Sequence, residues 1–208
     1  MGLRAVRVEH MLVSGIKSRP VYQGLEVDPY ARRHLFALGG EGALALLERP
    51  ELKDAEFRAK AEILYAADGS THATALQAAG AAGYWQAPSI PTLLTRLHVM
   101  LSTAHMGLRL YTAGTEGFIG QVMKVGTDAG VNFHSIRTEH RGSLARRMSC
   151  VHCKGITENV TTSPFVCSHC GLTLLVRDHY SRRLGAFQGV CINAEVPAEI
   201  PPVEELYK

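Results

Sequence analysis

The 208-residue sequence lacks any long hydrophobic run, and its charges nearly balance. No stretch approaches the roughly 18 apolar residues that a membrane-spanning helix needs, so no membrane association is expected. The formal net charge of +3 is too small to indicate a nucleic-acid-binding protein from bulk charge alone. The first residues contain no apolar segment followed by a small-residue cleavage site. We therefore expect a cytoplasmic protein whose cysteines are kept reduced.

Cysteines are few, but their spacing is informative. Four of the five form two Cys-x-x-Cys pairs, Cys150 with Cys153 and Cys167 with Cys170. In a reducing compartment such pairs indicate a metal before disulfides. Four thiolates complete a tetrahedron around zinc and leave no open position, so the sequence predicts a structural zinc site. Iron accepts the same ligands, and a rubredoxin-like electron carrier is the alternative.

The residues around the cysteine pairs suggest secondary roles. Gly155 and Gly171 suit the left-handed turn positions that such loops contain. His152 and His169 lie inside the pairs and are not expected to replace a thiolate. Cys191 has no partner nearby in the sequence and is expected in the core. The arginines that flank the cysteine pairs are expected to form a solvated rim or a docking face for a partner. Phosphate binding is the alternative. No group of aromatic residues that could stack on bases accompanies these arginines, so no nucleic-acid partner is expected. These arginines are Arg141, Arg146, Arg147, Arg177, Arg182 and Arg183.

Upstream of the cysteines, strand and helix patterns alternate. Apolar runs predict strands at 34–38, 61–66, 84–86, 108–113 and 131–136, and helical periodicity separates them at 41–48, 70–79, 89–105 and 116–129. Ser70 or Thr71 is a candidate cap for the second helix, and Thr115 for the last. Repeated strand–helix–strand units of this length predict an α/β fold with a parallel sheet and flanking helices.

Composition divides the chain into four parts. Residues 1–32 are predicted to form an extended arm, because prolines and glycines interrupt any helix or strand pattern there. Residues 33–142 form the predicted α/β domain, and residues 143–195 form a zinc-ribbon module. The proline- and glutamate-rich residues 196–208 are expected to form an extended tail that docks on something or is disordered.

Two glycine turns follow predicted strands. Gly39 and Gly40 follow the first strand, and Gly114 follows the fourth. Parallel sheets bind ligands at the carboxyl ends of their strands, and backbone amides there can hold phosphate. These residues are therefore candidate nucleotide-binding residues. The first turn is not a Gly-x-Gly-x-x-Gly fingerprint, however, and Glu41 would repel a phosphate, so a vestigial or purely structural turn is the alternative.

The α/β part resembles the nicotinamide-binding module of ferredoxin reductases. The resemblance covers residues 33–140 and rests on LYTAGTEGF at 110–118, GGEG at 39–42 and IRTE at 136–139. Ala113 stands where those reductases have cysteine, and Thr115 where they have proline. The flavin-binding barrel that precedes the module in reductases is missing, because residues 1–32 are too short to form one. The resemblance therefore implies a reductase module without its electron-transfer parts.

The C-terminal part resembles the small, DmmA-type subunit of bacterial dimethylamine monooxygenase. CVHC at 150–153, FVCSHCG at 165–171 and LVRDHYSR at 175–182 carry this resemblance. The family implies a multi-subunit enzyme that oxidises dimethylamine to methylamine and formaldehyde. Haem is then expected on one partner subunit, and FMN and an iron–sulfur cluster on a reductase partner. This chain would be an accessory subunit that docks the two, with no catalytic residues of its own.

Other functions stay open on the sequence alone. An NAD(P)H-binding reductase component requires the glycine turns to be functional. A rubredoxin-like carrier requires iron in place of zinc, and a nucleic-acid-binding zinc ribbon requires the arginines to contact phosphates.

Overall fold

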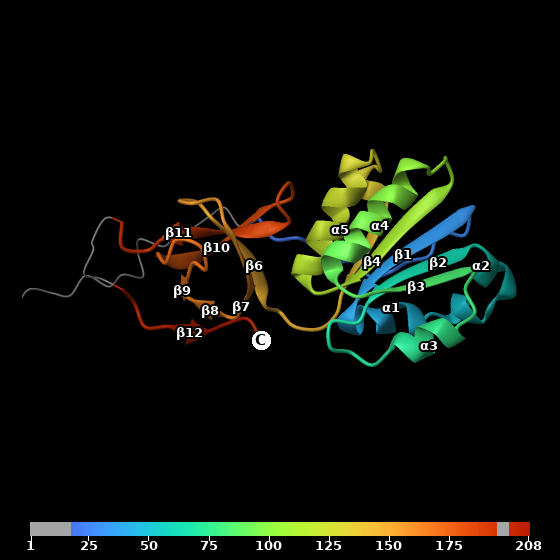
Figure 1. Ribbon diagram of the computed structural model, residues 1–208, viewed down its shortest axis with the longest axis horizontal. Coiled ribbons are helices and arrows are strands. Elements are labelled where there is room, and N and C mark those ends of the chain that lie inside the picture. Colours follow the sequence, from blue (N-terminus) through green and yellow to red (C-terminus); the bar gives the residue numbers. More distant parts are fainter. Residues whose placement is uncertain (1–17, 195–199) are drawn as a thin grey trace, which may run out of the picture.

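A five-stranded parallel sheet forms the centre of the N-terminal half (Figure 1). A computed structural model describes residues 18–194 and 200–208. The strand order is β3-β2-β1-β4-β5, and every neighbouring pair is parallel. The strands are β1 (Arg33–Gly39), β2 (Ala61–Ala66), β3 (Gly83–Ala87), β4 (Leu108–Gly114) and β5 (Ile136–His140). The predicted α/β class is therefore confirmed.

Helices cover both faces of this sheet (Figure 1). On one face α4 (Ile90–Ser102) and α5 (Glu116–Asp128) pack against each other, and each begins at a side-chain cap, Ser89 and Thr115 respectively. The other face carries shorter helices. These are the 3-10 turns η2 (Gly40–Gly42) and η3 (Pro50–Lys53) with α1 (Ala43–Leu47), α2 (Ala55–Ala59) and α3 (Ala73–Ala78).

The middle strand explains why the sheet has two hydrophobic layers. Leu35 and Ala37 point into the cluster under α4 and α5, whereas Phe36 and Leu38 point into the cluster under the shorter helices. All four side chains are fully buried. A strand buried on both faces reads as a continuous apolar run, which is why β1 is recognisable in the sequence.

Two local predictions need correction. The last strand is β5, not 131–136, because Gly130 ends α5 with a φ of +86° and Asn132 then caps the 3-10 turn η4 (Phe133–Ser135). Ser70 and Thr71 do not cap α3, whose N-cap is His72. The Ser70 hydroxyl instead contacts the hydroxyl of Tyr65. In residues 50–59, for which no element was predicted, the structure has η3 and α2.

The C-terminal half contains a second five-stranded sheet in the order β7-β6-β11-β10-β9. β6 and β11 are parallel, and the other pairs are antiparallel. A short pair, β8 with β12, lies beside it. The strands are β6 (Arg146–Cys150), β7 (Ile156–Val160), β8 (Thr162–Ser163), β9 (Phe165–Val166), β10 (Thr173–Ser181), β11 (Ala186–Cys191) and β12 (Glu204–Glu205).

Both ends of the described chain pack onto the C-terminal half. Ser18 exchanges backbone hydrogen bonds with Asp178 and Tyr180 of β10, at 2.9 and 3.0 Å. At the other end, β12 pairs with β8. The described part of the tail is thus docked on the chain itself.

No helix among residues 18–194 and 200–208 has the length and apolarity required to cross a membrane.

Candidate metal centre

The four paired cysteines converge at one end of the second sheet. Cys150 ends β6 and Cys167 directly follows β9, so each is held by a strand, whereas Cys153 and Cys170 close the following turns. Cys150 and Cys167 are 1% and 2% exposed, and the other two are partly buried. The fold therefore brings together the set that the sequence predicts.

The sulfur positions suit a tetrahedral metal ion. All four Sγ atoms lie within 4.8 Å of one another. The Sγ atoms of Cys150 and Cys170 are 3.8 Å apart, and those of Cys153 and Cys167 are 3.7 Å apart. A tetrahedron with sulfur about 2.3 Å from zinc has sulfur–sulfur edges of about 3.8 Å. The same distances are far too long for disulfides, whose sulfurs are about 2.05 Å apart.

Backbone amides prepare a thiolate at this site. Burial works against ionisation of Cys167, but hydrogen bonds from the amides of Cys170 and His169, together with contacts from the sulfurs of Cys170 and Cys153, lower the pKa of Cys167 to about 6. The amide of Leu172 also favours a thiolate at Cys170, yet burial and the three neighbouring sulfurs raise the pKa of Cys170. Four clustered sulfurs therefore need a cation before all of them can ionise.

Each cysteine pair ends in a left-handed residue, as such turns require. Gly171 has a φ of +72°, as predicted, but its counterpart in the first turn is Lys154, at +63°. Gly155 does not adopt a positive φ, so its predicted role is wrong. Glycine is required at position 155 for a steric reason, because a Cβ there would lie 2.5 Å from the imidazole of His169. The amide of Gly155 donates to the sulfur of Cys153 at 3.4 Å.

Two of the remaining side chains near the cysteines, those of His169 and Cys191, have structural partners. The His169 ring contacts the carbonyl of Ile156 at 2.8 Å, and His152 is exposed. Cys191 is partly buried against the module core, and its thiol contacts Asn193 at 3.2 Å.

Most of the flanking arginines are engaged within the chain. Arg141 pairs with Glu48 and Glu139, and Arg147 pairs with Glu158. Arg182 lies over the Phe133 ring. Arg177 and Arg183 are exposed.

Arg146 has a role that its sequence position did not indicate. Its guanidinium lies 4.1 Å from the ring centroids of both Phe187 and Tyr207, and it donates to Asp178 at 2.9 Å. Its side chain is only 7% exposed.

The three candidate nucleotide-binding glycines meet at the carboxyl edge of the parallel sheet. A Cβ at Gly114 would lie 2.9 Å from the carbonyl oxygen of Gly39, and a Cβ at Gly39 would lie 2.9 Å from the Phe118 ring. Gly40 has a φ of +51° and accepts from the Tyr65 hydroxyl. Close packing and backbone conformation therefore explain why glycine stands at each of these three positions, without a bound nucleotide.

The chain's own arm crosses this edge. The amide of Gly24 donates to the carbonyl of Thr138, and the amide of Leu25 donates to Glu139 at 2.8 Å. Leu25 is 1% exposed and belongs to the core cluster that includes Tyr111.

A cavity of about 560 Å³ remains between this arm and the start of α5, and its charges are mainly negative. Tyr22 donates to Glu116 at 3.2 Å, and Glu139 and His140 also line the cavity. Burial raises the pKa of Glu116 above its ordinary value, although the hydrogen bond from Tyr22 and nearby cations oppose this shift. Carboxylates at this edge disfavour a phosphate group.

Two domains of one family match this chain. The N-terminal domain of "Dimethylamine monooxygenase subunit DmmA-like" matches residues 14–136, and the C-terminal domain matches residues 147–190. The chain belongs to the DmmA-like family. The DmmA-like C-terminal domain includes all four paired cysteines.

A curated relative of this DmmA-like chain is the "Heme-dependent oxidative N-demethylase delta subunit" of Ectopseudomonas mendocina (strain ymp). The two are 34% identical over 110 residues, which is 53% of this chain and 63% of the relative. The chain thus spans less than two thirds of the length of the curated relative.

Solved structures with a partly similar fold include an intact type IV self-sufficient cytochrome P450 monooxygenase. It is 16% identical, with a TM-score of 0.43, and the match covers 77% of this chain and 21% of that one. A flavohemoglobin from Malassezia yamatoensis is 14% identical, with a TM-score of 0.39, over 57% of this chain and 33% of that one. At this level the similarity does not bear on the activity of the DmmA-like chain.

Proposed function

We propose that this chain is a non-catalytic, zinc-containing subunit of a haem-dependent dimethylamine monooxygenase. The complex would oxidise dimethylamine to methylamine and formaldehyde. Haem would lie on one partner subunit, and FMN and an iron–sulfur cluster on a reductase partner. The family description and the name of the curated relative support membership of such a complex.

One observation carries the non-catalytic role. The carboxyl edge of the parallel sheet, where a related module would bind its cofactor, is crossed by the arm and carries Glu116 and Glu139. Gly39 and Gly114 pack against each other there. This arrangement favours a retained scaffold over a working nucleotide site, and it leaves the chain a docking role between the haem and reductase subunits.

The zinc ion would be structural. Cys150, Cys153, Cys167 and Cys170 would supply all four ligands, so no position stays open for water or substrate. When bound, zinc would cross-link the end of β6 to the turn after β9. It would take no part in redox chemistry. The described C-terminal core is small, and metal binding would add the folding free energy that so small a core lacks.

The first test combines elemental analysis with an absorption spectrum of the purified chain. We expect one zinc per chain and no visible absorption band. One iron per chain, with thiolate-to-iron bands that bleach on reduction, would instead support the rubredoxin-like carrier and contradict the proposed role.

The second test measures assembly. The purified chain is mixed with the haem subunit and with the flavin/iron–sulfur subunit, and complex formation is followed by analytical ultracentrifugation. We expect binding to both, and N-demethylase activity that requires all three. An active enzyme assembled without this chain would contradict the docking role.

The alternative of an NAD(P)H-binding component has its own test. Isothermal titration of the isolated chain with NADH and NADPH should show no saturable binding. Saturable binding that is lost in Gly114→Val would support the alternative and assign the cavity at the carboxyl edge to a nucleotide.

A further inference from the structure

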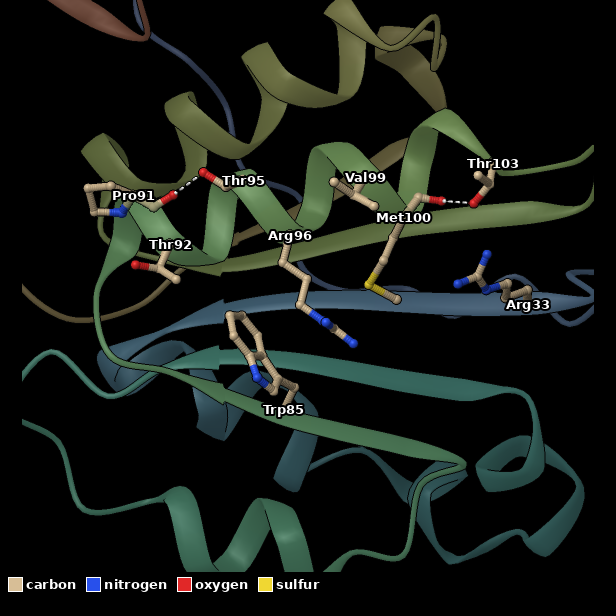
Figure 2. Close-up of a pocket in the computed structure, with 9 residues that line it drawn as sticks. All are labelled: Arg33, Trp85, Pro91, Thr92, Thr95, Arg96, Val99, Met100 and Thr103. Carbon is tan, nitrogen blue, oxygen red and sulfur yellow. Dashed lines mark hydrogen bonds between the residues drawn. The ribbon is translucent and has the colours of Figure 1, made fainter.

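The N-terminal and C-terminal halves meet at a joint that contains a cavity. The groove between α4 and the edge strand β3 is no part of this joint, because residues of the N-terminal half alone line it (Figure 2). The cavity at the carboxyl edge of the parallel sheet, by contrast, is lined by three segments. They are the arm (20–24), the N-terminal half (Glu116, Glu139 and His140) and the linker after β5 (Leu144). A volume of about 560 Å³ stays unfilled between them, so these segments pack loosely against one another.

The arm bridges the joint and is bonded to both halves. Ser18 is held to β10 of the C-terminal half by two backbone hydrogen bonds. The amides of residues 24 and 25 donate to β5 of the N-terminal half. Between these two anchors, the hydroxyl of Tyr22 donates to the carboxylate of Glu116 at 3.2 Å. The arm is therefore a strap that ties the second sheet to the carboxyl edge of the first.

Glu116 is the carboxylate at the centre of the joint. Groups from four other segments face it: Arg19 and Tyr22 of the arm, Glu139 and His140 of β5, Arg146 of β6 and Tyr180 of β10. Among the residues that the structure describes, no ion pair includes Glu116. The two nearby arginines both pair with Asp178 instead. An ionised Glu116 is thus partly buried without a paired cation.

Most of the groups that cover Glu116 can move without unfolding the parallel sheet. The arm, β6 and β10 lie on one side of the carboxylate, whereas α5 is anchored on the other side by the buried Phe118 and Val122. The linker between β5 and β6 is exposed at residues 142–144. Glu116 can therefore reach water if the arm and the second sheet shift while α5 stays in place.

We propose that the arm is a strap that holds the C-terminal half against the start of α5, and that it loosens when the Glu116 carboxyl loses its proton. Burial raises the pKa of Glu116 above 4.5 in the closed joint, and water returns it towards that value in the open joint. The closed joint thus holds a proton that the open joint releases. Opening becomes easier as the pH rises from 4.5 to the raised pKa, and below 4.5 both forms are protonated. The inference concerns this chain alone and stands apart from the proposed docking role.

Hydrogen exchange of the full chain, measured amide by amide from about pH 5 to about pH 8, tests the strap. The metal content is checked at each pH. The amides of Ser18, Leu25 and Tyr180 report the strap, because each donates a hydrogen bond between the arm and one of the halves. The amide of Val122 reports α5. Each rate is divided by the rate of the same amide in Glu116→Gln at the same pH, which cancels the intrinsic pH dependence of exchange.

We expect this ratio to rise with pH for the three strap amides, by up to about tenfold per pH unit, because one proton is released on opening. The ratio for Val122 should stay near one. Tyr22→Phe removes a hydrogen bond that favours the ionised carboxyl, so its rise should continue to a higher pH than in the unchanged chain. Glu26→Gln, at an exposed position of the arm, should match the unchanged chain.

Two results would overturn the proposal. A ratio that does not change with pH for the strap amides would show that ionisation of Glu116 does not open the joint. An equal rise at Val122 would show that the N-terminal half unfolds as well, so that no separate strap exists. If Glu116→Gln did not fold, Tyr22→Phe would take its place as the reference, and an unmoved pH range would contradict the proposal.

Discussion

At the scale of single residues, Arg146 joins two aromatic rings and a carboxylate in the C-terminal half. It lies between the rings of Phe187 and Tyr207 and pairs with Asp178. We predict that Arg146→Gln lowers the free energy of unfolding of this half by about 2–4 kcal/mol, because two cation–π contacts and a buried ion pair are lost. Denaturant unfolding followed by tyrosine fluorescence measures the change.

Two further variants separate charge from stacking. Arg146→Lys keeps the charge but loses the planar group, so an intermediate loss is expected. Arg183→Gln removes an exposed arginine of the β10–β11 hairpin and should change stability by less than about 0.5 kcal/mol. Equal stability of Arg146→Gln and Arg183→Gln would contradict the role given to the sandwiched guanidinium.

Glu116 provides a pH-dependent prediction. Burial raises its pKa above the ordinary value of 4.5, so folding favours the protonated carboxyl. The stability it contributes is present below pH 4.5 and is lost as pH rises through the raised pKa. Glu116→Gln stays neutral and can still accept from Tyr22, so it should be more stable than the unchanged chain at pH 8 and nearly equal at pH 4.

Thermal unfolding of both chains across this range tests the sign. Glu26→Gln, an exposed position on the arm, is the control. A stability difference that is the same at pH 4 and pH 8 would show that ionisation of Glu116 does not explain it.

The sequence predicted single residues well where chemistry fixes the spacing. Cys150, Cys153, Cys167 and Cys170 meet because two short turns are enough to place four sulfurs. The predicted solvated rim or docking face is wrong for Arg146, which is buried against partners that lie far along the chain, Tyr207 among them. Long-range contacts of this kind leave no local pattern.

At the scale of elements, α5 joins the two halves. A Cβ at Gly120 would collide with the Tyr180 hydroxyl and would lie 2.9 Å from the Gly185 Cα. Gly to Ala in a helix normally stabilises by about 1 kcal/mol. We predict the opposite sign for Gly120→Ala, because the hairpin between β10 and β11 must move away from the helix.

Limited proteolysis between β5 and β6 measures this separation. Cleavage should be faster in Gly120→Ala, and adding Tyr180→Phe should restore part of the protection because the nearest atom is removed. A more stable Gly120→Ala chain with unchanged cleavage would show that the two halves do not pack through this glycine.

Elements with strong periodicity were predictable, and short ones were not. The caps of α4 and α5 stand in the sequence at Ser89 and Thr115. The last strand was predicted too early in the chain because Val131 continues the apolar pattern of α5. In the structure, Gly130 and Asn132 turn the backbone before β5 begins. Helices of five residues, such as α2, are too short for periodicity to show.

At the scale of the whole molecule, the two halves have different sources of stability. The parallel sheet has a core cluster on each face, built around Phe36 on one side and Leu35 on the other. The second sheet packs around a smaller cluster that includes Cys150 and Cys167. Part of the C-terminal core is therefore made of the proposed metal ligands.

Removing zinc should unfold one half and spare the other. With a chelator, or in Cys167→Ser, we expect hydrogen exchange to become fast in β6, β10 and β11, whereas amides of β1 and β4 stay protected. The reason is that the small core loses the cross-link that one metal ion provides between its four sulfurs. Cys191→Ser, outside the cluster, should keep one zinc and full protection of these amides from hydrogen exchange.

If β6, β10 and β11 stayed protected after complete zinc loss, the metal would not be structural. The arm and the tail would then hold the C-terminal half, since Ser18 pairs with β10 and β12 pairs with β8 without any metal.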